Sequence, residues 1–587
     1  MKIWEVEELS LTASETFDNP YMDVDVWIDL KGPGFEKRVF GFWDGGQSFK
    51  IRFTAVSPGE WSYASGASRR DRGLCGKTGS FTASDWTEEE KAANRSRRGI
   101  LRPGKNGRGF AHPDGRSFFM IGDTWWAAPS YRFKWSDDNE ERPLEECYFK
   151  DLVKYRIGQG YNTIAMLAGH PTWANDGFPP EIEIEPGVYA RQAWKQSGTE
   201  SAKDMGNEGG RPFLFPGKVK GYEQVAPDFT RVNPEYFKHL DKKVQYLHNN
   251  GVLSFIEVIR RDVSTVWKKY GGWPDTYIRY IQYVFARYQA HFTLLSPIHF
   301  DWAAASIPSR DYNGPVNEWL EKYGKPPFGT LLGTNASPST LVNFGGPGEA
   351  PWLTFHQTGN WREHDHHWYL TEIYRSNPPM PALAGEPYYP GFPDEKPPAD
   401  SRDAELNCRA GLYGSVLSGA LGGFIYGAQG IWGADIEAGA PRKMAGAFTL
   451  KSGTQAPFLK EFVLSEGDRY TELIPDSELV TPNKAGDPMG YRGWAYCAAT
   501  AGRDYALIYL EKDCPPATIR GFPPDTSYRI SWFDPETGQW IDRIDKDKND
   551  NNDNNKILVT DGTGRAPLPA PPLGDDVGIK LIRAEGV

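Results

Sequence analysis

Two acidic side chains each follow directly on an apolar run of the sequence. Asp301 comes after the run LLSPIHF, and Glu386 comes after the run PALAG. If both runs are strands of one parallel barrel, their ends meet at the same rim, where such enzymes carry their chemistry. Cleavage of a glycosidic bond needs one carboxyl group to protonate the leaving oxygen and a second to attack the anomeric carbon or to activate water. Either residue alone would more often be a structural ion-pair or capping residue. Their shared position at strand ends makes them candidates for glycoside hydrolysis.

Further polar and aromatic residues recur at the ends of other apolar runs. Each position taken singly fits packing at a rim as well as contact with a sugar. Their recurrence favours contact, because a barrel brings all strand ends to one cavity. We expect these residues to bind substrate: Asp123, Trp125, Trp126, His170, Glu257, Arg260, His356, Tyr388, Tyr426 and Trp432.

Some sequence features resemble metal sites or sites with a different nucleophile, but none has the spacing that such a site requires. The stretch from Glu363 to His367 contains three histidines, but adjacent residues do not share a helix face. His364 and His367 could share one, at i and i+3, and we interpret the stretch as a solvated helix start, with zinc as the less favoured alternative. The Asp- and Asn-rich run 546–556 lacks the central Gly and terminal Glu of a calcium loop. The five cysteines have no C-x-x-C spacing, and no G-x-S-x-G elbow has the right context. We therefore expect no metal site and no cofactor.

The elements that must position the two carboxylates lie between residues 110 and 460. Short apolar runs alternate there with amphipathic helices, as in βαβ units around a parallel sheet. We expect helices over 234–250 and 275–289. An eighth strand would lie near Phe344 or be too weak to see in the sequence. The seven visible strand candidates are 118–122, 163–168, 253–259, 293–300, 352–355, 382–385 and 423–426. This series favours a (β/α)8 TIM barrel over a doubly wound sheet, because no G-x-G-x-x-G follows the first strand.

Both ends of the chain have the period-two pattern of antiparallel strands, as in Val24, Val26, Ile28 and Leu30. We predict an α/β protein of three domains: an N-terminal β-sandwich over 1–95, a (β/α)8 catalytic barrel over 96–465 and a C-terminal β-sandwich over 466–587. The Gly- and Pro-rich segment 173–229 is too long for an ordinary βα loop and is expected to cover substrate.

Composition restricts the partners. The net charge is −11, which argues against nucleic acid, and no stretch approaches the ~18 apolar residues of a membrane span. The chain contains 21 Trp and 29 Tyr, and their flat apolar faces suit sugars, so we expect an oligosaccharide or polysaccharide substrate. The first residues lack the apolar core of a signal peptide. We expect a cytoplasmic protein, or a secreted or periplasmic one if a signal peptide was removed; no oligomeric state is predicted.

Several motifs occur in the order seen in a known family. FFMIGDTWW, GYNTI, Asp301, LTFHQTGN, ALAGEPYY and FIYGAQGIWG together resemble the apiosidase-like glycoside hydrolase domain. The segment GFWDGGQSFKIRFTAVSPGEWSY resembles a small domain of unknown function that precedes such barrels. Residues 505–540 resemble a C-terminal sandwich of the collagen-binding type. The resemblance covers almost the whole chain.

The resemblance implies that Asp301 is the acid/base and Glu386 the nucleophile. Family members carry Gly-Gly-Asp where this chain has His299-Phe300-Asp301. As an acid, Asp301 requires a raised pKa, from burial or from the charge of Glu386. We expect an exo-acting, retaining enzyme on glycans derived from plant or algal polysaccharides, with apiose, arabinofuranose, rhamnose and galactose all open as the sugar. The alternative is an inactive carbohydrate- or matrix-binding protein, against which the presence of both carboxylates argues.

Overall fold

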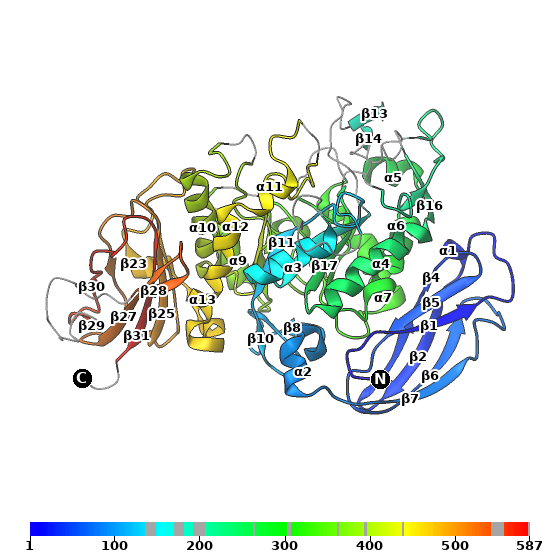
Figure 1. Ribbon diagram of the computed structural model, residues 1–587, viewed down its shortest axis with the longest axis horizontal. Coiled ribbons are helices and arrows are strands. Elements are labelled where there is room, and N and C mark those ends of the chain that lie inside the picture. The colour runs from blue at the N-terminus through cyan, green and yellow to red at the C-terminus, as the bar shows by residue number, and fades with distance from the viewer. Residues whose placement is uncertain are drawn as a thin grey trace.

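The chain folds into three regions that follow one another along an elongated molecule (Figure 1). The computed structural model describes residues 1–135, 148–169, 181–191, 206–224, 226–261, 264–301, 307–360, 363–364, 366–392, 396–436, 439–541 and 557–584. The Asp- and Asn-rich run 546–556 and His170 lie outside these residues. None of the helices in the described ranges has the length and apolar character needed to cross a membrane.

The N-terminal region consists of two antiparallel sheets. The alternation in β2 buries Val26, Ile28 and Leu30 on one face, and a single hydrophobic cluster contains residues of both sheets. One sheet has the order β3-β2-β6-β7 and the other β1-β5-β4. The strands are β1 (Glu7–Thr12), β2 (Val26–Gly32), β3 (Phe35–Phe40), β4 (Phe42–Trp43), β5 (Ser48–Phe53), β6 (Gly59–Ala67) and β7 (Thr78–Ala83).

A parallel sheet of seven strands forms the centre of the molecule, in the order β18-β17-β12-β11-β21-β20-β19. Its strands are β11 (Met120–Thr124), β12 (Thr163–Gly169), β17 (Leu253–Ile259), β18 (Thr293–Ser296), β19 (His356–Thr358), β20 (Ala382–Ala384) and β21 (Gly423–Tyr426). The first and last strands along the chain, β11 and β21, are paired side by side, so the sheet curls into a barrel-like form. Six of the seven expected strands overlap strands of this sheet. The seventh, over 352–355, was placed wrongly, because those residues form no strand and β19 begins only at His356.

The segment 331–336 lies between the two edge strands, β18 and β19. Leu332 and Ala336 form isolated parallel bridges with Leu295 and Phe300 on one side. On the other side the amide of Thr354 donates to the carbonyl of Leu332 at 2.8 Å. The region near Phe344, one of the two expectations for an eighth strand, is instead helix α8 (Thr340–Phe344), so that expectation was wrong. The other, an eighth strand too weak to see in the sequence, stays a prediction.

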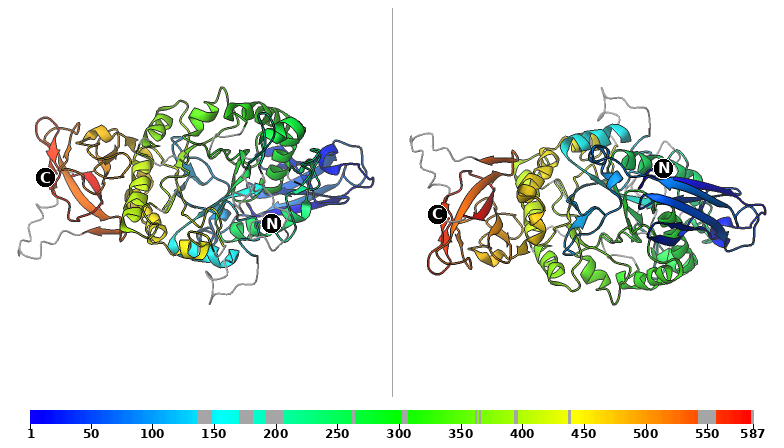
Figure 2. Two further views of the ribbon diagram at one scale, coloured as in Figure 1. Left: turned by 90° about the horizontal axis from the view of Figure 1, so that it is seen from above. Right: turned by 90° about the horizontal axis from the view of Figure 1, so that it is seen from below.

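Helices surround the parallel sheet, as the views along its axis show (Figure 2). The two helices expected from the sequence are α4 and α6. Helix α4 begins at Pro234, after the N-cap residue Asn233. The helices are α3 (Phe149–Gln159), α4 (Pro234–Asn249), α5 (Ser264–Tyr270), α6 (Asp275–Tyr288), α7 (Asn313–Tyr323), α9 (His366–Arg375), α10 (Arg402–Leu417), α11 (Met444–Phe448), α12 (Lys451–Gln455) and α13 (Leu459–Val463).

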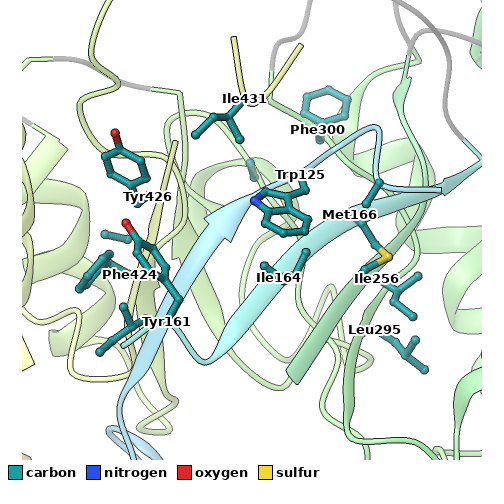
Figure 3. Packing of buried hydrophobic residues seen from close by; sticks show 14 of the residues in the cluster. Trp125, Tyr161, Ile164, Met166, Ile256, Leu295, Phe300, Phe424, Tyr426 and Ile431 are labelled. Carbon is teal, nitrogen blue, oxygen red and sulfur yellow. The ribbon is translucent and has the colours of Figure 1, made fainter. Parts of the chain in front are cut away.

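The two faces of the parallel sheet belong to different hydrophobic clusters. The outer cluster contains strand residues such as Ile164, Met166 and Phe424 (Figure 3). It joins them to residues of the helices, such as Leu240 and Leu412. The inner cluster consists of strand residues, a few residues that close the amino end of the sheet, and Trp126 beyond the carboxyl end of β11. The inner strand residues are Met120, Ala165, Leu167, Leu253, Phe255, Leu294, Leu383 and Ile425. Membership of one cluster or the other therefore tells which way a strand side chain points.

The C-terminal region is antiparallel. Its larger sheet has the order β22-β24-β25-β31-β27-β28, with β29 also on β27, and its smaller sheet has the order β23-β26-β30. The strands are β22 (Ile474–Pro475), β23 (Val480–Thr481), β24 (Ala495–Ala499), β25 (Tyr505–Leu510), β26 (Thr518–Ile519), β27 (Ser527–Asp534), β28 (Gln539–Ile541), β29 (Ile557–Val559), β30 (Ala566–Pro567) and β31 (Val577–Arg583). One hydrophobic cluster lies between the two sheets.

The histidines at the start of α9 are buried and not solvated, so the expectation of a solvated helix start was wrong. His364 stacks on Trp494, with ring centroids 4.1 Å apart, and its Nε2 lies 2.6 Å from a carboxylate oxygen of Glu511. His367 packs edge-on against Tyr496 at 4.8 Å. All three aromatic and acidic partners belong to the C-terminal region, so these histidines join it to the central one.

Candidate active site

Asp301 and Glu386 both contact the chain segment that leaves β19. The backbone amides of Gly385 and Glu386 donate to the carbonyl of Thr358 at 2.7 and 3.3 Å. Two residues further on, the side-chain amide of Asn360 donates to the carbonyl of Asp301 at 3.2 Å. Both acidic residues are buried, at 9% and 4% exposure. The structure thus brings the ends of β18 and β20 to the same edge of the sheet, on either side of one short segment.

The carboxylate of Asp301 is surrounded by positive charge. Arg260 donates to both of its oxygens, at 3.2 and 2.7 Å, and the Nε of Arg261 lies 3.3 Å from Oδ1. Burial alone would raise the pKa of Asp301, but the charges of Arg260, Arg261 and His299 outweigh burial and hold this pKa well below its usual range. The expectation of a raised pKa was therefore wrong for the free protein, where Asp301 is ionised.

Glu257 and His299 form a second buried pair next to Asp301. Nδ1 of His299 is hydrogen-bonded to one oxygen of Glu257, and the other oxygen accepts the backbone amide of Asn335 at 2.8 Å. The other ring nitrogen of His299 lies 3.6 Å from Asp301, and Trp126 packs edge-on against the ring at 4.5 Å. Burial disfavours the charged ring, but the two carboxylates outweigh burial and raise the pKa of His299 to about 10. The protonated ring of His299 therefore lies between the carboxylates of Glu257 and Asp301.

His299→Gln should reveal this charge through the pH dependence of stability. A histidine with a pKa of about 6.5 unfolded and about 10 folded stabilises fully below pH ~6.5, and the contribution is lost as the pH rises through the folded pKa. The Tm advantage of the wild type over His299→Gln should therefore shrink between about pH 6.5 and about pH 10, measured by thermal denaturation. Lys243, whose pKa burial lowers to about 7, titrates in both proteins and cancels in the difference. A difference that stays constant would mean that His299 is neutral.

Four of the expected substrate contacts point away from the inner face of the sheet. Asp123 binds the Nε of Arg156 on α3 at 2.6 Å, and Trp125 lies in the outer cluster (Figure 3). Tyr426 also lies there, with its hydroxyl 3.1 Å from the hydroxyl of Ser452 on α12. His356 is hydrogen-bonded to Thr340 of α8 at 2.7 Å. These side chains hold the sheet to the helices, so the structure does not bring them to the inner face beside the carboxylates.

Asp123→Asn should consequently destabilise the protein without changing its chemistry. Asp123 and Arg156 are 0% and 1% exposed, and the change leaves a buried guanidinium without its counter-charge. The free energy of unfolding should fall by about 3–5 kcal/mol in urea denaturation. The control is Asp29→Asn, which breaks an ion pair with Arg38 that is about half exposed and should cost less than about 1 kcal/mol. A large loss of kcat at a temperature where Asp123→Asn is folded would instead place Asp123 in the active site.

Other expected contacts lie nearer the carboxylates. Trp126 belongs to the inner cluster and Trp432 packs against it, so both face the inside of the barrel-like sheet. Arg260 pairs with Asp301 as described. Tyr388 is placed differently: its backbone side adjoins Gly411 of α10, and its ring packs against Tyr491 of the C-terminal region at 5.6 Å.

Sequence reasoning missed two inward-facing amides, Asn335 and Gln357. Gln357 lies between His356 and Thr358, which both bond to helices, so its own side chain points inward. Asn335 leaves segment 331–336 beside Glu257. The only signal for Gln357 was its position next to His356, and the sequence LLGTNAS has no apolar run to identify Asn335 as a strand end.

Among the described residues, no three His, Cys, Asp or Glu side chains are placed to hold a metal ion. The chemistry available at this edge of the sheet is that of carboxylates, guanidinium groups, an imidazolium and neutral amides. This combination suits proton transfer and nucleophilic attack at an acetal carbon.

Comparison with known proteins agrees with this chemistry. The family described as "Apiosidase-like, catalytic domain" matches residues 104–467, and a domain of unknown function, DUF5060, matches residues 1–68. No curated protein matches the chain. A provisionally assigned glycoside hydrolase from Bacteroides vulgatus ATCC 8482 has a similar structure, with 15% identity, a TM-score of 0.62 and 99% of each chain covered.

A glycoside hydrolase of family 5 from the same organism is similar over 83% of this chain and 94% of its own, with 16% identity and a TM-score of 0.55. At such identities the likeness shows a shared fold. The family match shows more than the fold, because it spans more than half of the chain. It confirms the resemblance drawn from motifs such as GEPYY. The chain belongs to the apiosidase-like glycoside hydrolases.

Proposed function

We propose that this glycoside hydrolase removes a terminal sugar from glycans derived from plant or algal polysaccharides, with retention of anomeric configuration, and that Asp301 and Glu386 are its catalytic carboxylates. The observation that carries the proposal is their convergence: both contact segment 358–360 at the carboxyl end of the parallel sheet. Retention requires that the two carboxyl groups stand ~5 Å apart when substrate is bound.

Glu386 is assigned as the nucleophile and Asp301 as the acid/base. Double displacement uses the acid/base in both protonation states: it gives a proton to the leaving oxygen, then takes one from water. The free protein holds Asp301 in the ionised state, beside Arg260. The assignment therefore requires that substrate binding weakens this ion pair, so that Asp301 gains a proton before the bond is cleaved.

The architecture proposed for this function is a (β/α)8 barrel over 96–465 between β-sandwiches over 1–95 and 466–587. Segment 331–336, which is bridged to β18 and hydrogen-bonded toward β19, takes the place of the fifth strand. The paired sheets at each end of the chain, each with one shared cluster, support the two sandwiches.

Exo action is supported by the described part of the long insertion. The hairpin of β13 (Glu181–Glu185) and β14 (Val188–Arg191) is fixed to α5, because Thr265 exchanges hydrogen bonds with the backbone of Tyr189 at 3.0 and 2.6 Å. Helix α5 follows the carboxyl end of β17. The hairpin thus lies at the edge that carries the carboxylates, where it would close one end of the substrate site.

Product analysis tests the proposal. The protein is incubated with plant and algal polysaccharides and with 4-nitrophenyl glycosides of apiose, arabinofuranose, rhamnose and galactose. We expect free monosaccharide from the first time points, and the first-formed anomer, followed by NMR, to keep the substrate configuration. A rapid fall in polymer size with little monosaccharide would exclude exo action. Binding of glycans with no hydrolysis of any substrate would favour an inactive carbohydrate-binding protein.

A further inference from the structure

Two side-chain amides at the carboxyl end of the parallel sheet are buried without hydrogen-bonding partners. Asn335 is 1% exposed and Gln357 is 0% exposed. Neither the oxygen nor the nitrogen of either amide is paired with any described residue. Native proteins pair nearly all of their buried polar groups, because an unpaired one is unfavourable. Two such groups at the edge of the sheet that carries Asp301 and Glu386 point to a ligand that pairs them.

The backbone leaves room for both amides to reach inward. A Cβ atom at Gly359 would lie 1.9 Å from Oδ1 of Asn335, and one at Gly385 would lie 2.8 Å from Oε1 of Gln357. A larger residue at either glycine would displace the amide. Asn335 is thus placed against the segment that leaves β19, and Gln357 against the residue that precedes Glu386.

The surroundings of the amides connect them to the catalytic carboxylates. Gly385, against which Gln357 lies, adjoins Glu386, and its own amide bonds to Thr358. Gly359, against which Asn335 lies, adjoins Asn360, which bonds to the backbone of Asp301. Gln357 therefore lies against the neighbour of Glu386, and Asn335 lies against the neighbour of a residue that bonds to Asp301. A sugar held between Asp301 and Glu386 would be within reach of both amides.

We propose that Asn335 and Gln357 bind hydroxyl groups of the sugar ring whose bond is cleaved, and that they select a neutral sugar with two adjacent free hydroxyls. A primary amide offers one acceptor and two donors, and a hydroxyl can use both kinds. Neighbouring strands lie ~4.8 Å apart, a separation that one sugar ring spans. The amides carry no charge, so they supply no counter-charge to a carboxylate substituent. The inference rests on the proposed function.

The test uses two apolar replacements of similar shape, Asn335→Leu and Gln357→Met. If the amides are unpaired in the free protein, removing them should leave Tm unchanged or higher. At the same time, kcat/KM for the 4-nitrophenyl glycoside that the wild type cleaves best should fall about 10- to 100-fold, because the hydroxyls lose their partners. Loss of function with gain of stability is the signature of a binding group and not of a structural one.

Asn162→Leu is the matched control. Asn162 is a buried amide at the opposite, amino end of the sheet, where it accepts the amide of Ile121 at 2.8 Å and donates to the carbonyl of Phe119 at 2.9 Å. The control should lower Tm and leave kcat/KM of the folded protein close to the wild-type value. If Asn335→Leu and Gln357→Met behave like the control, the two amides are structural and the inference is overturned.

A second measurement separates this inference from the proposed function. Free D-galactose, L-arabinose, L-rhamnose and D-apiose are added to the wild type and to both variants, and the shift in Tm is recorded. At least one sugar should raise Tm of the wild type and have little effect on the variants. If the wild type hydrolyses nothing yet shows this pattern, the proposed activity fails while the amide site stands. If no sugar shifts the wild type, or if the variants respond equally, the amides do not bind sugar.

Discussion

Glu386→Gln is expected to abolish turnover on every glycoside, with a fall in kcat of about 10⁴-fold or more. An amide cannot attack the anomeric carbon, so the covalent glycosyl-enzyme cannot form. The quality of the leaving group does not help, because the missing step is the attack itself. Nitrophenyl glycosides and natural glycans should therefore lose activity together, which initial rates on both kinds of substrate will show.

Glu405→Gln is the control for this change, because Glu405 on α10 is equally buried, at 4% exposure, and accepts hydrogen bonds from Gln455 and Arg402. It should keep its kcat. Azide added to Glu386→Gln should attack in place of the missing carboxylate and give a glycosyl azide of inverted configuration. If the wild-type product is itself inverted, Glu386 is a general base and no covalent glycosyl-enzyme forms.

The period of the apolar residues was sufficient to predict most elements around the site. Strands over 253–259 and 423–426 have the expected bounds, and α4 and α6 end within a few residues of expectation. Segment 331–336 could not be found in this way, because LLGTNAS contains one apolar pair followed by five small or turn-forming residues and forms only isolated bridges. Its place is defined by the strands on either side of it, which is tertiary information.

The direction of side chains at strand ends was harder to predict than the strands themselves. Strands of this sheet are buried on both faces, so their sequences are apolar throughout and give no alternation that separates inside from outside. A shift of one residue exchanges the faces. The expected contact His356 faces a helix, whereas its neighbour Gln357 faces inward. Asp123 faces Arg156 of α3 for the same reason.

The electrostatics of the site depends on partners that are distant in the sequence. His299 was evident as a departure from Gly-Gly-Asp, but its partner Glu257 is 42 residues away, and Arg260 is 41 residues from Asp301. An isolated buried carboxyl group next to Glu386 would have the raised pKa that the sequence suggested. The positive charges of Arg260, Arg261 and His299, which follow two different strands, instead lower the pKa of Asp301.

Asp301→Asn is therefore expected to change both stability and chemistry. The substitution removes the counter-charge of Arg260 and Arg261, which are buried, and should lower the free energy of unfolding by about 3–5 kcal/mol. Natural glycans have poor leaving groups that need a proton, so kcat on them should fall about 10²- to 10⁴-fold. Nitrophenol leaves without a proton, so the first step on aryl glycosides should be largely preserved, and azide should relieve the slow second step.

The loss of stability and the loss of catalysis can be separated with a matched variant, Asp576→Asn. Asp576 forms the same two-pronged pair with Arg409, at 2.8 and 2.7 Å, where the central and C-terminal regions meet. This control should lose stability in urea denaturation but show no dependence of kcat on leaving group and no response to azide. If Asp301→Asn behaves like Asp576→Asn and keeps its kcat on natural glycans, Asp301 serves only to balance Arg260, Arg261 and His299. The acid must then be another carboxyl group, and Glu257, which lies on the other side of His299, is the next to replace.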